Sequence, residues 1–324
     1  MRPRGAHLRI GTRSSTLAVW QTERVRALLR QHGFETERVE IKTTGDLTPD
    51  VPLARIGSRA LFTKQIDDAL LEGHIDLAVH SLKDLPTQLP AGITIAAVGD
   101  REDPRDALVG RGPIRWAELQ KGAAIATSSL RRRAQILNLR PDLIVVDIRG
   151  NVDSRLTKLD ARPDWTGTIL AVAGLVRLGL TQRIGERLPA EVMLPAPGQG
   201  ALAVTVRTDD AKVQVAVRRA VHHEASAIPV AAERAFLRRL EGGCQVPVAA
   251  YAESGEGPHS IRLWGRIVSV GGEKAVSGHE TGLAPTESAA DQLGVMLAER
   301  LLSQGAAAIL TEVRSAVVPA VTEP

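Results

Sequence analysis

The sequence predicts an α/β protein of two lobes with a central cleft, followed by a smaller α+β domain. Three observations predict this fold. In the first two-thirds of the 324 residues, short apolar runs typical of buried strands alternate with helical patterns. Two segments rich in proline, glycine or charge, 101–106 and 194–200, interrupt this alternation. After about residue 222, three runs of alternating polarity lie between two helical patterns.

The first elements follow directly from their residues. Residues 8–11 are typical of a strand, and 16–32 form an amphipathic pattern with Ser15 as its N-cap and Gly33 at its end. A second helix is predicted from about 61 to 72. The other predicted strands of this part are 38–44, 75–82, 93–99, 123–128, 143–149, 167–174 and 201–207. Because helical patterns separate most of them, we expect largely parallel sheets.

The two interrupting segments are predicted to be linkers. Since residues 201–207 after the second linker again form a strand, the chain should cross to a second lobe and return, which leaves a cleft between the lobes. The predicted units are 1–101 with 199–221, then 102–198, and then 222–324. In the last unit we expect helices at 223–240 and 286–304 and three antiparallel strands at 248–254, 260–269 and 274–280.

Composition excludes several classes of protein. Hydrophobic residues make up 44% and charged residues 24%, as in ordinary globular proteins. No run approaches the ~18 apolar residues of a membrane span, and the basic N-terminus lacks an apolar signal core, so we expect a cytoplasmic location. Aromatic residues are 2%, too few to stack on single-stranded nucleic acid. A nucleic-acid role is therefore weakly supported.

The single cysteine, Cys244, lies in the loop-like run LEGGCQVPV. It has no partner for an intrachain disulfide, and no CxxC pair is present to hold zinc or an iron–sulfur cluster. Two interpretations remain: a free thiol that fills a small hole, or a thiolate that carries a group covalently. Gly242 and Gly243 remove side chains from its approach, and Pro247 prevents a helix from continuing, which favours the second.

Arginines and hydroxyl side chains gather at four predicted strand-to-helix junctions. They are Arg13 and Ser15 in GTRSS, Thr127, Ser129, Arg131 and Arg132 in ATSSLRRR, Arg149 and Arg155 in DIRGNVDSR, and Arg177 in AVAGLVR. Helix N-termini and guanidinium groups both bind carboxylates or phosphates. Four such junctions indicate a ligand with several negative groups. No GxxxxGK[ST] or GxGxxG motif occurs there, which disfavours a nucleotide.

One carboxylate, Asp84 in HSLKDLP, follows a predicted buried strand at the expected cleft. An exposed Lys–Asp pair in a turn is the alternative interpretation. Among so many arginines, however, this carboxylate is a candidate for proton handling or for stabilising a cationic intermediate. His222 and His223 lack the spacing and acidic neighbours of a metal site, so we interpret them as structural and predict no metal.

With these residues assembled, the chain resembles the porphobilinogen deaminase (hydroxymethylbilane synthase) family. The resemblance runs from residue 8 to about 254 through TRSSTLA, TTGD, HSLKDLP, REDPRDAL, TSSLRRR, RGNVDSRL, AVAGLVRLGL, LPAPGQGA and AERAFLRRLEGGCQVPV. It implies a transferase of tetrapyrrole synthesis that joins four porphobilinogen molecules, releases ammonia at each addition and frees hydroxymethylbilane by hydrolysis. It also implies two lobes like those of type II periplasmic binding proteins.

The resemblance assigns roles to individual residues. Cys244 matches the cysteine that carries a dipyrromethane cofactor through a thioether, and Asp84 matches a carboxylate that assists deamination and coupling. Ser81 and Gln199 fall near the same cleft. The residues that match binders of the acetate and propionate side chains are Arg13, Ser15, Lys83, Thr127, Ser129, Arg131, Arg132, Arg149, Arg155 and Arg177. The family expectation is a monomer, with no nucleic-acid or membrane partner.

The chain also departs from the family pattern. Arg55 and Arg59 stand where many members have lysine, in a loop that covers the cleft in this family, and Phe62 matches an aromatic residue near the cofactor rings. Pro229 lies in a stretch that often carries arginine. Two alternative functions are a receptor for a polycarboxylate and a regulator that senses phosphate or binds nucleic acid. The Cys244 loop argues against the first, and the lack of a recognisable DNA-binding motif argues against the second.

Overall fold

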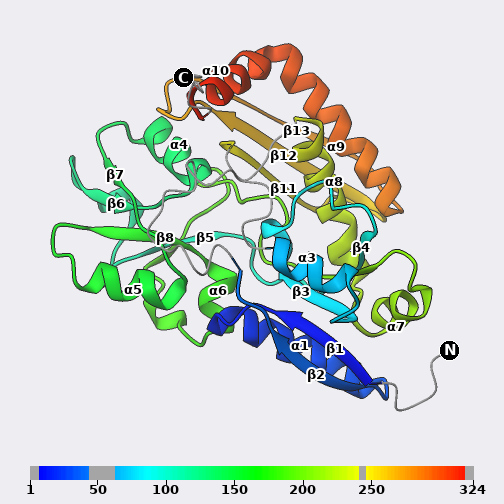
Figure 1. The fold of residues 1–324 in the computed structure, drawn as a ribbon. Coiled ribbons are helices and arrows are strands. Elements are labelled where there is room, and N and C mark those ends of the chain that lie inside the picture. The colour runs from blue at the N-terminus through cyan, green and yellow to red at the C-terminus, as the bar shows by residue number, and fades with distance from the viewer. Residues whose placement is uncertain (1–6, 44–62, 241–245, 318–324) are drawn as a thin grey trace, which may run out of the picture.

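The structure is a computed structural model that describes residues 7–43, 63–240 and 246–317. Its strands form three sheets, two of five strands and one of three, each packed against helices (Figure 1). Each sheet draws its strands from one of the three units expected from the sequence. The unit boundaries themselves stay a prediction.

The first sheet has the strand order β2-β1-β3-β10-β4. Its strands are β1 (His7–Thr12), β2 (Glu35–Glu40), β3 (Leu77–Ser81), β4 (Ile93–Val98) and β10 (Leu202–Arg207). Helices α1 (Thr16–Gln31) and α7 (Ala211–Val221) share one buried cluster with the sheet, whereas α3 (Lys64–Leu71) belongs to a second cluster. Since neighbouring residues of β3 fall in different clusters, the helices cover both faces. A 3₁₀ turn, η2 (Leu82–Asp84), follows β3.

The second sheet has the order β7-β6-β8-β5-β9. Its strands are β5 (Asp106–Val109), β6 (Ala124–Ala126), β7 (Ile144–Val146), β8 (Gly167–Ala171) and β9 (Glu186–Arg187). The helices of this lobe are α4 (Leu130–Leu139), α5 (Val152–Asp160) and α6 (Val172–Arg177), with 3₁₀ turns η3 (Trp116–Glu118) and η4 (Thr181–Arg183). The predicted strand 167–174 is therefore wrong at its end, because its last three residues begin α6.

The expectation of largely parallel sheets is only partly confirmed. β1 is parallel to β2 and β3, and β6 is parallel to β7 and β8. In contrast, β10 is antiparallel to β3 and β4, and β5 is antiparallel to β8 and β9. β5 and β10 are the strands that follow the two linkers, so each enters its sheet from the opposite lobe and runs the other way. β5 is only four residues long and is not among the strands predicted from the sequence.

The third domain is an antiparallel sheet covered by helices. β11 (Val248–Ser254), β12 (Ser260–Val268) and β13 (Ala275–Leu283) pair in sequence order, which confirms the predicted three-stranded sheet. Phe236 of α8 (Glu224–Arg239) is fully buried in its core, beside Leu263 and Leu297. A Cβ on Gly265 of β12 would lie 2.4 Å from the Phe236 ring, so only glycine fits where the helix crosses the sheet.

The C-terminal helical segment is longer than predicted. α9 (Glu287–Leu301) is followed by a short segment, η5 (Leu302–Ala306), in which the non-helical backbone of Gly305 (φ 106°) forms a kink before α10 (Ala307–Val317). Residues Glu287–Ser315 are long and apolar enough to cross a membrane by length and composition alone. Leu293, Leu297 and Leu301 of this segment lie in the buried cluster of the third domain. We therefore interpret it as a core helix.

Candidate active site

The described site residues predicted from sequence follow the carboxyl ends of strands in both five-stranded sheets. Lys83 and Asp84 lie in η2 directly after β3, and Arg13 comes directly after β1. In the second lobe, Thr127 follows β6, and Arg177 ends α6, which follows β8. Ligands of open α/β sheets bind at these strand ends. Cys244, Arg55, Arg59 and Phe62 lie outside the described residues.

Hydroxyl groups of the site cap the helices that begin there. The Ser15 Oγ accepts a hydrogen bond from the Ala18 amide at the start of α1. At the start of α4, the Ser129 Oγ accepts from the Arg132 amide, and the Thr127 Oγ1 accepts from the Ser129 amide at 3.2 Å. A capping hydroxyl is an acceptor and keeps its own proton to donate. These helix starts can therefore still bind an anion.

Asp106, the first residue of β5, is the centre of a buried polar network. Its Oδ2 lies 2.8 Å from Arg131 Nη1, and its Oδ1 lies 2.7 Å from Arg132 Nη2. The Gln199 Nε2 also donates to Oδ1 at 3.0 Å, and the Gln199 Oε1 accepts from Lys83 Nζ at 3.1 Å. Burial alone would raise the pKa of Asp106, but the two arginines hold it well below its usual range. Gln199 thus connects the two lobes.

Three cations of the same site, Lys83, Arg149 and Arg155, make no hydrogen bond to a carboxylate of the described residues. Burial, together with the nearby cations Arg132 and Arg149, lowers the pKa of Arg155 to about 10, whereas Asp84 opposes the change. Burial likewise lowers the pKa of Lys83 to about 8. The Arg149 Nη1 is buried without a hydrogen-bond partner. These cations are half-buried, and an anion that pairs with them offsets the cost of their desolvation.

Asp84 lies within the field of these cations but is not held by them. It is exposed, and no hydrogen bond or ion pair joins its carboxylate to any residue that the structure describes. Its charge nevertheless acts on both Lys83 and Arg155. The structure therefore places Asp84 of the first lobe within electrostatic range of Arg155 of the second lobe.

Two further predicted residues are held by neutral groups. The Arg177 Nη2 donates to the Gly200 carbonyl at 2.6 Å, and its guanidinium lies 5.5 Å from the centre of the Trp20 ring. The Ser81 Oγ accepts from Gln21 Nε2 at 2.8 Å. Arg177 is therefore positioned at the second linker, beside a partly exposed aromatic ring.

Sequence reasoning missed Asp106 and Gln21. Asp106 was included in the linker 101–106, although an acidic residue at the start of the apolar run DALV could have indicated a buried carboxylate. Gln21 lies in the middle of α1, and its pattern of neighbours gives no signal that its amide reaches Ser81. The contacts of Asp106 with its arginines and of Gln21 with Ser81 both join segments that lie far apart in the sequence.

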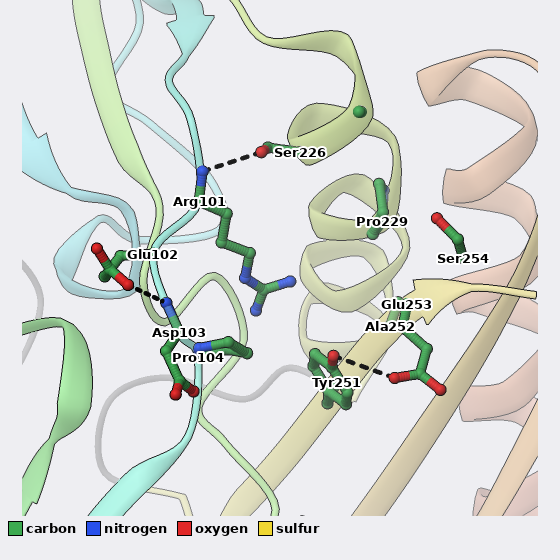
Figure 2. A pocket seen from close by; sticks show the side chains of 11 residues that line it. Arg101, Glu102, Asp103, Pro104, Ser226, Pro229, Tyr251, Ala252, Glu253 and Ser254 are labelled. Carbon is green, nitrogen blue, oxygen red and sulfur yellow. Dashed lines mark hydrogen bonds between the residues drawn. The ribbon is translucent and has the colours of Figure 1, made fainter.

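A separate cavity of about 250 Å³ lies between the first linker, α8 and β11 (Figure 2). None of the predicted site residues lines it. Its walls include Arg101, whose guanidinium pairs at 2.7 and 3.0 Å with the two oxygens of the buried Glu233. Glu233 also accepts hydrogen bonds from the Gly198 and Ala252 amides. The cavity thus marks the joint where both linkers attach to the third domain.

Comparison with known families decides which anionic ligand this site serves. Residues 8–215 match the domain described as "Porphobilinogen deaminase, dipyromethane cofactor binding domain", and residues 227–303 match "Porphobilinogen deaminase, C-terminal domain". The chain belongs to the porphobilinogen deaminase family. It is 49% identical over 308 residues to the porphobilinogen deaminase of Geotalea uraniireducens, with 94% of each chain covered. It is 51% identical over 305 residues to that of Rubrobacter xylanophilus, covering 94% of this chain and 97% of the relative.

Solved structures of solute-binding proteins are also similar to this chain. The methionine binding protein MetQ aligns with a TM-score of 0.43 and 14% identity, over 66% of this chain and 89% of MetQ. A periplasmic substrate-binding protein from Coxiella burnetii aligns with the same TM-score and identity, over 68% of this chain and 93% of its own.

The residues present fit the dipyrromethane cofactor of the porphobilinogen deaminase family. Each pyrrole of that cofactor carries two carboxylates, so the site must supply several cations. Asp106 can neutralise only one of its two arginine partners, while Lys83 and Arg155 have no carboxylate in their described hydrogen bonds. The buried, unpartnered Arg149 Nη1 offers one more donor. The excess of positive charge matches a polycarboxylate ligand.

Proposed function

We propose that this chain is a hydroxymethylbilane synthase, a transferase of porphyrin and haem biosynthesis. It joins four porphobilinogen molecules head to tail and releases the chain by hydrolysis, so that four substrates and one water give one hydroxymethylbilane and four ammonia. Membership of the porphobilinogen deaminase family supports this activity. The observation that carries it is a cluster of half-buried cations around one carboxylate, Asp84, that no described residue holds.

We propose that the dipyrromethane is attached through Cys244 and held by the cations of both lobes. When bound, it supplies the terminal pyrrole carbon to which the first substrate is added. Guanidinium groups bind carboxylates in bidentate geometry, and burial strengthens these contacts. The proposed carboxylate binders are Lys83, Arg131, Arg132, Arg149, Arg155, Arg13, Arg177, Ser15, Thr127 and Ser129. Ser81, Gln199, Arg55, Arg59 and Phe62 are proposed to complete the cleft.

Asp84 is the proposed catalytic residue. Loss of ammonia from porphobilinogen leaves a positive charge that is shared with the pyrrole nitrogen. A fixed carboxylate beside that N–H stabilises the charge as it develops, and does so again when the next ring attacks. Because Asp84 makes no hydrogen bond to the described residues, its oxygens are available for this contact.

We further propose that the enzyme works as a cytoplasmic monomer. Porphobilinogen and the growing oligopyrrole are its proposed partners, with no nucleic acid or membrane among them. The buried face of the long C-terminal helix supports this, because its leucines already pack in the third domain.

Intact mass spectrometry with an assay of ammonia release tests the proposed function. Purified wild-type protein should carry a mass increment of two pyrrole units and release ammonia from porphobilinogen. Cys244→Ser should fold, lack most of the increment and show little activity, because a serine hydroxyl is a far poorer nucleophile. A receptor for polycarboxylates would instead show the unmodified mass and release no ammonia.

A further inference from the structure

Helix α8 packs directly beneath the turn that carries Asp84. Ala227 and Val230 of α8 belong to the same buried cluster as Leu82 and Leu85, the residues on either side of Lys83 and Asp84. The residue spacing places Ala227 and Val230 on one face of the helix, and Arg234 follows on that face one turn later. The Arg234 Nη2 donates to the carbonyl of Pro86 at 2.9 Å.

Arg234 differs from the next arginines of the same helix. Arg238 pairs with Asp291 and Arg239 pairs with Glu299, each at 2.6 Å. No ion pair to Arg234 is found among the described residues, and its hydrogen bond there goes to the Pro86 carbonyl. Burial, together with the nearby Arg238, lowers the pKa of Arg234 to about 10. A desolvated cation thus makes a charge-assisted bond to the backbone of the Asp84 turn.

Hydrogen bonds join the Lys83–Asp84 turn to other described segments. The Leu82 amide donates to the Ala201 carbonyl at 3.0 Å, a backbone bond that does not depend on side-chain identity. The Lys83 Nζ donates to the Gln199 Oε1 at 3.1 Å, and the Arg234 Nη2 donates to the Pro86 carbonyl at 2.9 Å. Of these bonds, the one from Arg234 joins the turn to α8, the helix that precedes the Cys244 segment in sequence.

We propose that Arg234 is a positioning residue that holds the Lys83–Asp84 turn against α8, so that the Asp84 carboxylate keeps its catalytic orientation. The inference rests on the role proposed above for Asp84. Helix α8 can hold the turn in place because α8 itself is fixed relative to both linkers: the neighbouring Glu233 binds Arg101 of the first linker and the Gly198 amide of the second. Without the Arg234 bond, the hydrogen bonds of Leu82 with Ala201 and of Lys83 with Gln199 remain, and the turn can shift relative to α8. A displacement of ~1 Å at a reacting group costs on the order of 10² in rate.

The first test compares Arg234→Met with Arg239→Met, which removes a guanidinium from an exposed pair of the same helix. In Arg234→Met we expect kcat to fall roughly 10–100-fold, with KM within about 3-fold and a normal cofactor mass. Arg239→Met should stay within about 2-fold of wild type. Arg234→Lys keeps a donor to Pro86 and should recover most of the kcat. Wild-type kcat in Arg234→Met, or no recovery in Arg234→Lys, would overturn the proposal.

A double-mutant cycle with Asp84→Asn shows whether Arg234 acts through Asp84. In the Asp84→Asn background, Arg234→Met should cost less than about 3-fold, because the group it positions has already lost its charge. The full 10–100-fold loss in that background would show that Arg234 acts independently. Near-normal turnover in Asp84→Asn alone would refute the proposed catalytic role of Asp84. That outcome differs from additive losses in the double mutant, which would refute only the positioning role of Arg234. If Arg234→Met does not fold, Arg234→Gln provides the same cycle.

Discussion

Asp106 and Asp84 lie among the same cations but have opposite surroundings. Asp106 is fully buried, paired with Arg131 and Arg132 and hydrogen-bonded by Gln199. Asp84 is exposed and has no hydrogen-bond partner among the described residues. The first carboxylate pairs with the arginines, whereas the second is the one that we propose meets the substrate. Proximity to arginine alone therefore does not distinguish a structural carboxylate from a candidate catalytic one.

Asp67 on α3 shows what burial does without arginine. It is 4% exposed, its Oδ1 has no hydrogen-bond partner in the described structure, and burial raises its pKa to about 6. Asp106 is buried at least as deeply, yet its arginines hold its pKa well below the usual range. The difference shows that the Arg131–Arg132 pair is the counter-charge that makes a buried, ionised Asp106 stable.

The largest effect is expected when that counter-charge is removed. Asp106→Asn leaves two buried guanidinium groups without their carboxylate, so the free energy of unfolding should fall by about 3–5 kcal/mol. Urea unfolding measures this change. The control is Asp142→Asn, which breaks a partly exposed pair with Arg140 and should cost under about 1 kcal/mol. Equal losses in the two variants would show that Asp106 is no anchor for the arginines.

Arg149 tests the opposite case, a half-buried cation whose buried Nη1 has no hydrogen-bond partner among the described residues. Arg149→Leu removes a guanidinium that we assign to a ligand carboxylate, so cofactor loading or kcat/KM should fall roughly 10–100-fold. The unfolding free energy of cofactor-free protein should hardly change, because no described partner is lost with the Arg149 Nη1.

Arg162→Leu, which removes an exposed cation paired with Asp164, is the matched control for Arg149→Leu. It should leave cofactor loading and kcat/KM within about 2-fold of wild type. Unchanged activity in Arg149→Leu as well would mean that the buried guanidinium binds no ligand.

A smaller, pH-dependent effect is expected at Asp67. Its pKa is raised from 3.8 to about 6, so protonated Asp67 contributes stability that is fully present below pH 3.8 and is lost as the pH rises through about 6. Asp67→Asn should therefore raise the unfolding free energy by roughly 1–2 kcal/mol at pH 7.5, with little gain at pH 4. Asp68→Asn, in an exposed pair with Lys64, should show no such pH dependence. A gain that is independent of pH would contradict the ionisation argument.

Local sequence signals were enough to predict the strand-to-helix junctions and the residues at them. The caps Ser15 and Ser129 and the arginines after them depend on neighbours within a few residues, so their pattern is visible in sequence. The antiparallel direction of β5 and β10 could not be predicted, because it follows from how the chain crosses between the lobes. Strand direction after a crossing is a tertiary property.

The sequence also could not predict which carboxylate of the site is buried against arginines and which is exposed. Asp84 was singled out by its position after a buried strand, but Asp106 was assigned to a linker. Its burial depends on Arg131, Arg132 and Gln199, which lie 25 or more residues away along the chain. The sequence could therefore predict which residues are charged at the site, but not which of these charges neutralise one another.

Turnover of Asp84→Asn tests the central proposal, that the carboxylate of Asp84, which no described residue holds, is the catalytic one. Asparagine keeps the size and some hydrogen bonding of Asp84 but removes its charge. With the cofactor mass shown to be normal, kcat should fall on the order of 10²–10³, the usual cost of losing one charge contact in the transition state. Near-normal kcat in cofactor-bearing Asp84→Asn would contradict the account and reduce Asp84 to part of an exposed turn.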